Sequence, residues 1–128
     1  MSAPAIPRSL AALALSHTNK DLNFSREERT KLGLRGLLPP AVNSMDTQVA
    51  RVLAHLRNQS TDLERHEYIM NIMDYSERLF YATLAADLAF TMPLVYTPTV
   101  GEACQQYSNI YVKPRVRFDH TLICSDLS

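Results

Sequence analysis

The chain has 128 residues, 46% of them hydrophobic, and its 13 Lys and Arg residues balance its 13 Asp and Glu residues. This length allows one modest hydrophobic core and is short for a two-domain oxidoreductase. Because the formal net charge is zero and no stretch has the roughly 18 apolar residues of a membrane span, we expect neither nucleic acid nor a membrane as partner.

The cysteines and histidines show no metal-ligand pattern. Cys104 and Cys124 are far apart, and the four histidines are scattered, so we assign no metal ligands. One disulfide is conceivable, but a reduced intracellular protein is the simpler interpretation. The first 20 residues resemble either a weak mitochondrial presequence or a plain disordered start. We expect a cytoplasmic protein, with the mitochondrial matrix as the alternative.

The first third of the chain predicts a flexible N-terminal arm over residues 1–19 and then a short helix. Residues 10–15 are apolar enough to form one or two helical turns on a partner surface. Ser25 and Glu28 form a capping box that opens a helix ending at Gly33, and we expect its charged side chains to form a solvated face. The Gly36–Pro40 segment predicts a rigid apolar loop.

The middle of the chain predicts two long helical segments. Ser44 is expected to cap a helix that extends to about Arg57. One face of this helix is an apolar stripe that we expect to be buried, and Arg51 and Arg57 lie off it; the stripe consists of Val49, Val52, Leu53 and Leu56. A second capping box, Thr61 with Glu64, opens a helical pattern that extends to Leu88 and allows a break between residues 74 and 77. We expect the helix to end before Pro93.

The stretch 94–104, LVYTPTVGEAC, predicts a phenol at the mouth of a helix. Leu94 to Tyr96 is expected to be extended, Thr97 to be the N-cap, and Pro98 to begin a helix to about residue 107. Backbone N–H groups at a helix start favour the ionised form of a nearby phenol. The alternative is a buried tyrosine that only packs against the helix entry. Residues 110–112 are predicted to form a short strand.

These patterns together predict a mainly α fold of about four to six helices. The chain has only three glycines and no Gly-x-Gly-x-x-Gly segment, so it contains no dinucleotide-binding domain.

Three sequence strings resemble the malic enzymes, the malate dehydrogenases that decarboxylate malate oxidatively. The first is VYTPTVGEAC at 95–104, preceded by Met92-Pro93 and followed by QQY. The second is GLRGLLPP at 33–40, similar to the family's GL-x-GLLPP, and ERLFY at 77–81 is looser. The resemblance ends after about residue 115, so we expect a malic-enzyme-like N-terminal helical domain at 20–115 and a divergent tail at 116–128.

The resemblance implies a role for Tyr96 as the general acid that protonates the enolate of pyruvate. It implies malate and pyruvate as ligands of the complete enzyme, NAD or NADP and Mg or Mn as its cofactors, and homo-oligomers formed through helical surfaces. The family's general-base lysine, its metal ligands and its nucleotide-binding domain lie beyond the matching region. We therefore expect this chain alone to hold no cofactor and to be inactive.

Tyr75 departs from the family pattern. Many animal malic enzymes carry an arginine two positions before the glutamate that corresponds to Glu77, and in some members that arginine helps to bind an activating dicarboxylate. Activation by fumarate is therefore in doubt. A second functional hypothesis is a non-catalytic short product that acts as an oligomerisation or assembly module and exposes apolar surface.

Overall fold

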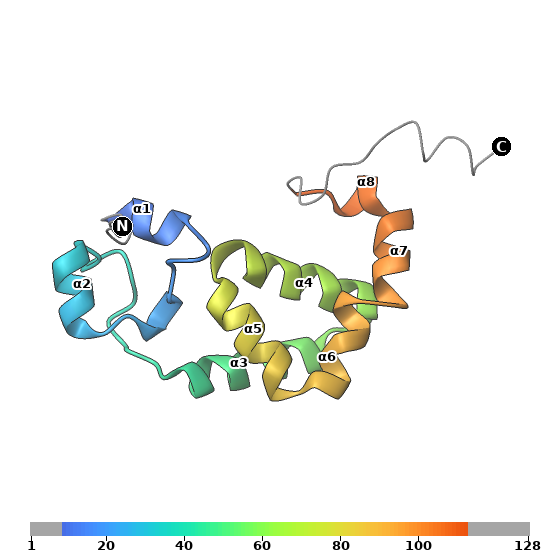
Figure 1. The fold of residues 1–128 in the computed structure, drawn as a ribbon, viewed down its shortest axis with the longest axis horizontal. Coiled ribbons are helices and arrows are strands. Elements are labelled where there is room, and N and C mark those ends of the chain that lie inside the picture. Colours follow the sequence, from blue (N-terminus) through green and yellow to red (C-terminus); the bar gives the residue numbers. More distant parts are fainter. Residues whose placement is uncertain (1–8, 113–128) are drawn as a thin grey trace, which may run out of the picture.

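A computed structural model describes residues 9–112, and these residues fold into α-helices without a β-strand (Figure 1). The helices are α1 (Leu10–Ala14), α2 (Arg26–Leu32), α3 (Met45–Asn58), α4 (Asp62–Tyr75), α5 (Glu77–Ala86), α6 (Leu88–Val95), α7 (Thr99–Gln105) and α8 (Tyr107–Ile110), with a 3-10 turn at Asp21–Asn23. The predicted mainly α fold is confirmed. Six of these helices have seven or more residues, and α1 and α8 are short additions to the four to six that the sequence predicted.

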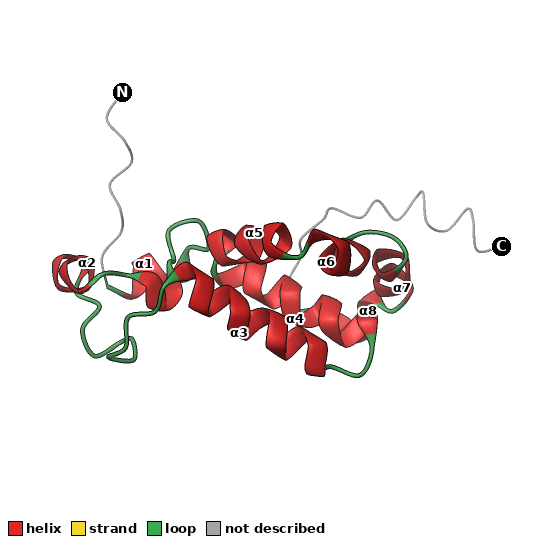
Figure 2. Cartoon of the chain, turned by 90° about the horizontal axis from the view of Figure 1, so that it is seen from below, coloured by secondary structure: helices red, strands yellow, loops and turns green. Residues whose placement is uncertain are grey.

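The main hydrophobic core lies between α3, α4, α5 and α6. The predicted apolar stripe of α3 is buried, and it packs with five residues from the other helices: Ile69, Ile72, Leu79, Phe80 and Leu94. Met70 and Met73 pack against the edge of this cluster, as expected of core-filling side chains. Figure 2 shows an elongated molecule in which α5 and α6 follow one another along one side and α3 and α4 lie along the other.

A second, smaller cluster lies at the N-terminal end of the molecule, around α1 and α2. Ala12, Phe24 and Leu34 are buried in it. We expected residues 1–19 to be a flexible arm, but Ala12 is fully buried and Asn19 is nearly so. The apolar run in α1 finds its packing surface within the same chain. Residues 1–8, and the tail expected at 116–128, lie outside the described residues, and the domain boundaries remain predictions.

The helix starts predicted from Ser, Thr and Glu spacing are confirmed. Ser25 with Glu28 and Thr61 with Glu64 form reciprocal capping boxes, and the Ser44 hydroxyl accepts the Thr47 N–H at 3.2 Å. Each cap satisfies N–H groups that a helix start leaves without an intrahelical partner. Gly33 ends α2 in the left-handed conformation with φ 70°, as predicted.

The break between α4 and α5 falls at Ser76, inside the predicted interval. The Ser76 hydroxyl caps α5 and donates to the Asn19 carbonyl at 2.8 Å, and the Glu77 N–H donates to the Ser16 carbonyl at 3.0 Å. The segment after α1 thus supplies hydrogen-bond partners at the break. This contact joins the small N-terminal cluster to the main bundle.

Two boundary predictions near the C-terminal end are wrong. Pro93 lies inside α6 instead of after it, and Leu94 is helical and buried. Asp87 starts α6 afresh, with its carboxylate accepting the Phe90 N–H at 3.3 Å. Pro93 removes a bond to the carbonyl of Ala89, an exposed residue whose carbonyl water can satisfy.

The predicted strand at 110–112 is not formed. Ile110 is the last residue of α8, and no neighbouring strand is present among residues 9–112 to pair with it. An isolated strand has no partner for its backbone groups, so the β-branched residues alone do not produce one.

Arg29 contradicts the prediction that the charges of α2 form a solvated face. Its side chain is 6% exposed and donates to four backbone carbonyls, at 2.6 to 3.1 Å. The carbonyls are those of Leu22, Phe24, Pro39 and Ala41. The guanidinium therefore fixes the Gly36–Pro40 loop against the segment before α2.

Candidate functional site

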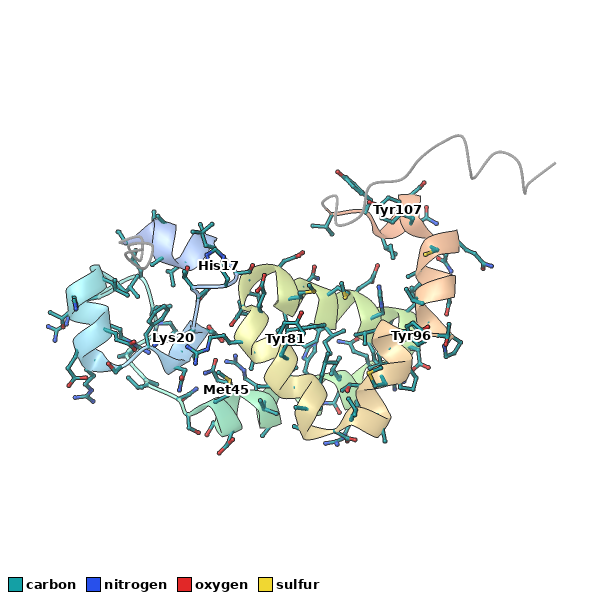
Figure 3. All side chains as sticks on the ribbon, viewed as in Figure 1. His17, Lys20, Met45, Tyr81, Tyr96 and Tyr107 are labelled. Atoms are coloured by element: carbon teal, nitrogen blue, oxygen red, sulfur yellow. The ribbon has the colours of Figure 1, made fainter. Side chains whose placement is uncertain are left out.

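Tyr96 lies at the junction of α6 and α7 (Figure 3). Its backbone is extended, with φ −127° and ψ −156°, and its N–H donates to the Met92 carbonyl at 2.9 Å. Its side chain is 64% exposed, and its hydroxyl forms no hydrogen bond with residues 9–112. The alternative interpretation, a buried tyrosine that only packs against a helix entry, is therefore wrong.

The start of α7 differs in detail from the prediction. Pro98, not Thr97, occupies the N-cap position, and no side chain caps the helix. The Val100 N–H donates instead to the Tyr96 carbonyl at 2.8 Å. The backbone of Tyr96 thus bonds to both helices, backward to α6 and forward to α7. These two bonds hold the phenol-bearing residue in place without a side-chain cap.

His66 fixes the C-terminal end of α6 from the side of α4. The imidazole is 8% exposed, and its Nδ1 lies 2.7 Å from the Leu94 carbonyl, so Nδ1 carries the hydrogen and donates. Leu94 lies two residues before Tyr96 and is itself buried. In the sequence, His66 is only one of four scattered histidines. A contact between side chain and backbone across 28 residues leaves no pattern in the sequence.

Thr99 is a second residue that no sequence pattern singles out. Its side chain is buried at the start of α7, and its Oγ1 has no hydrogen-bond partner among the described residues. A buried hydroxyl without a partner is uncommon, because it loses its hydrogen bonds to water. It lies three residues after Tyr96, in the string that carries the family resemblance.

Exposed apolar side chains continue from Tyr96 along α6. Leu88, Met92 and Tyr96 are spaced four residues apart, and all three are exposed. This spacing places Leu88 and Met92 on one face of α6, and Tyr96 follows as the C-cap residue of the helix. Tyr81, on α5, is exposed as well. We call Leu88, Met92 and Tyr96 the α6 stripe.

Tyr75 ends α4 in a half-buried position, away from the α6 stripe. Burial is the largest cause that raises the pKa of the Tyr75 phenol to about 12, and the nearby Asp21 and Tyr68 raise it further, against the opposing Arg51. Arg51 is paired with Asp21 at 3.0 Å. Tyr75 therefore stays neutral at physiological pH and gives no positive charge to an anionic ligand at this position.

Residues 9–112 contain neither a metal-ligand cluster nor a parallel sheet of the kind that binds dinucleotides. No group of three or more His, Cys, Asp or Glu side chains that could hold a metal ion occurs within residues 9–112. The parallel sheet that positions a dinucleotide is also missing from this part of the chain. Cys104 is exposed and not in a disulfide, whereas Cys124 lies outside the described range. In the described residues, no helix is long and apolar enough to cross a membrane.

Residues 73–123 match the family model of the malic enzyme N-terminal domain. This interval includes α5, α6 and α7 with the Tyr96 junction. It extends beyond residue 115, where we expected the resemblance to end.

The particular relatives are NADP-dependent malic enzymes. The chain is 49% identical over 102 residues to the NADP-dependent malic enzyme of Homo sapiens. The matched segment is 80% of this chain and 18% of the human enzyme. The chain is 48% identical over 99 residues to a chloroplastic form of Oryza sativa subsp. japonica, covering 77% of this chain and 16% of the relative. It is 44% identical over 102 residues to a mitochondrial form of Mus musculus, covering 80% and 17%.

These matches confirm the resemblance to the malic enzymes, since residues 73–123 are similar to the malic enzyme N-terminal domain and most of the chain is similar to the corresponding segment of these relatives. The chain spans less than a fifth of the length of these relatives. Since mitochondrial and chloroplastic forms both occur among them, the compartment of this protein remains a prediction.

Proposed function

We propose that this chain supplies the N-terminal helical domain of an NADP-dependent malic enzyme, which converts malate to pyruvate and carbon dioxide. The similar enzymes of Homo sapiens and Sus scrofa are NADP-dependent, which favours NADP over NAD. The exposed phenol of Tyr96, within the matched interval, is the observation that carries the proposal.

In this proposal Tyr96 holds a proton on its Oη and delivers it to C3 of the enolate that is left when carbon dioxide departs. Exposure makes the phenol reachable by a substrate held against the α6–α7 junction. The backbone bonds of Tyr96 and the His66 contact at Leu94 fix the position of the phenol. In the complete enzyme a bound nicotinamide would take up the hydride and a bound divalent metal would polarise the ketone; within residues 9–112 no group of three or more His, Cys, Asp or Glu side chains that could hold the metal is found.

The test is a Tyr96→Phe variant of the complete enzyme. We expect kcat to fall by about 10²- to 10⁴-fold, the usual range for loss of a general acid, while KM for malate changes little. Tyr81→Phe is the matched control, because Tyr81 is an exposed tyrosine on the neighbouring helix and should retain full activity. A Tyr96→Phe enzyme with unchanged kcat would remove Tyr96 from the mechanism.

The α6 stripe favours a second candidate function, a non-catalytic assembly module. Three apolar side chains exposed along α6 and at its C-cap are a feature of interaction surfaces. In this case the chain would pair with complete malic enzyme subunits or with itself, and would carry no activity of its own.

A further inference from the structure

A cavity of about 450 Å³ lies between α2 and the loop that follows it. Its charged lining consists of three arginines, Arg26, Arg29 and Arg35. Leu34, Leu38 and Pro40 form apolar parts of the wall. The volume falls within the range of roughly 300 to 1,000 Å³ that is typical of small-molecule sites.

The positive charge of this cavity has no counterion among the described residues. No carboxylate lines the cavity, and none of the three arginines is in an ion pair within residues 9–112. Glu28, on the same helix, is occupied by Lys20 and by the Ser25 N–H of the capping box. The chain is neutral overall, so this cavity is a local concentration of positive charge.

Arg29 gives the cavity a rigid wall. Its hydrogen bonds to the Pro39 and Ala41 carbonyls hold the end of the loop after α2, and its other two bonds tie this end to the segment before α2. Carbonyl dipoles satisfy its N–H groups but do not neutralise its charge. A buried charge with few surrounding waters is screened less than an exposed one, so it contributes more to the potential of the cavity.

Arg26 and Arg35 are the two exposed cationic groups of the cavity. Both are exposed, and neither side chain forms a hydrogen bond with the described residues. Guanidinium groups bind the oxygens of phosphates and carboxylates in a bidentate manner. Two guanidinium groups, one on α2 and one on the loop that follows it, can therefore bind the same multiply charged oxyanion.

We propose that this cavity binds a small phosphate-type oxyanion, held by Arg26 and Arg35 over the fixed charge of Arg29. The site is separate from the Tyr96 junction, and its existence does not depend on the proposed malic enzyme function.

The experiment is an NMR titration of the 128-residue chain with inorganic phosphate, with sodium chloride adjusted to keep the ionic strength constant. We expect saturable shifts of the arginine Nε–H signals and of the Gly36 amide, which lines the cavity. The Arg26→Gln/Arg35→Gln double variant should raise Kd at least about tenfold, the effect of losing one charge-assisted contact. Arg78→Gln, an exposed arginine on α5, should leave Kd unchanged.

Three results would overturn the proposal. These are shifts that do not saturate, equal shifts when chloride replaces phosphate, and a double variant that binds as the unmodified chain does. A parallel titration with acetate distinguishes a multiply charged phosphate from a singly charged carboxylate. Equal saturation by acetate would contradict the proposed preference for phosphate. The substituted arginines are exposed, so far-UV circular dichroism should confirm that the double variant is folded.

Discussion

Two residues in this protein, Arg29 and Tyr75, have environments that their residue type alone does not predict. Arg29 is a charged residue on a short, highly charged helix, yet it is among the most buried polar residues of the described chain. Tyr75 stands where an arginine is expected from the family resemblance, and it is half-buried and neutral. In both cases the neighbouring segments, rather than the residue type, set the role.

Replacing Arg29 with Met should lower the free energy of unfolding by about 3 kcal/mol, because four carbonyl oxygens would lose a charged donor in a buried site. Urea unfolding followed by circular dichroism measures this loss. Arg26→Gln on the same helix is the control and should change the stability by less than about 0.5 kcal/mol. Equal stability of the two variants would show that the four bonds contribute little.

Tyr75→Phe should reduce the loss of stability at alkaline pH. The folded-state pKa is about 12, above the ordinary value of 10.0, so between these values the unfolded chain releases the phenolic proton first. The free energy of unfolding therefore falls as pH rises from about 10 towards 12, and this contribution is fully retained below pH 10.

The measurement is a series of urea midpoints between pH 8 and 11.5, roughly spanning the onset of Tyr75 ionisation. The curve of Tyr75→Phe should fall less steeply than that of the unmodified chain. Tyr81→Phe removes an exposed phenol and should follow the unmodified curve. If the Tyr75→Phe curve runs parallel to the unmodified one, burial of this phenol does not couple to stability.

At the scale of elements, the helices are joined at their ends by specific hydrogen bonds as well as by packing. Ser76 joins the break between α4 and α5 to the segment after α1, and His66 joins α4 to the end of α6. Arg57 pairs with Asp87 at 2.8 Å and so connects α3 to the start of α6. These contacts fix the helix that leads into Tyr96.

His66→Leu should lower the free energy of unfolding by about 1 to 2 kcal/mol, because the buried Leu94 carbonyl would lose its donor. It should also speed amide hydrogen exchange at Tyr96, whose N–H belongs to the same end of α6. His55→Leu is the matched control, since His55 is exposed on α3. Unchanged exchange at Tyr96 in His66→Leu would mean that α6 keeps its end without the imidazole.

At the scale of the whole molecule, two hydrophobic clusters of unequal size are joined in one elongated chain of helices (Figure 2). The larger cluster carries the α6 stripe and Tyr96 at one end, and the smaller cluster carries the arginine-lined cavity at the other. The two proposed sites are therefore built on different parts of the fold, so each can be disrupted without the other.

The assembly hypothesis belongs to this scale. We expect the 128-residue chain to co-elute with a complete malic enzyme in size-exclusion chromatography, and a Leu88→Asp/Met92→Asp variant to lose this association, because two charges would enter an apolar contact. Leu37→Asp/Val42→Asp changes two exposed apolar residues near the other end and should still co-elute. Separate elution of the unmodified chain would refute the hypothesis.

Local sequence chemistry determined the helical character of this protein, the starts of three helices and the buried face of α3. The capping residues at Ser25, Ser44 and Thr61 act within a few residues of chain, so their effect is readable without a fold. The resemblance that singles out Tyr96 is likewise a property of a continuous string.

Tertiary structure alone decided the burial of Arg29, the packing of α1, the course of α6 through Pro93 and the exposure of Tyr96. Each of these features depends on whether a distant segment provides a carbonyl or an apolar surface at that point or leaves the residue exposed to solvent. The His66–Leu94 contact and the arginine-lined cavity arise in the same way, because they join residues whose proximity no local pattern encodes.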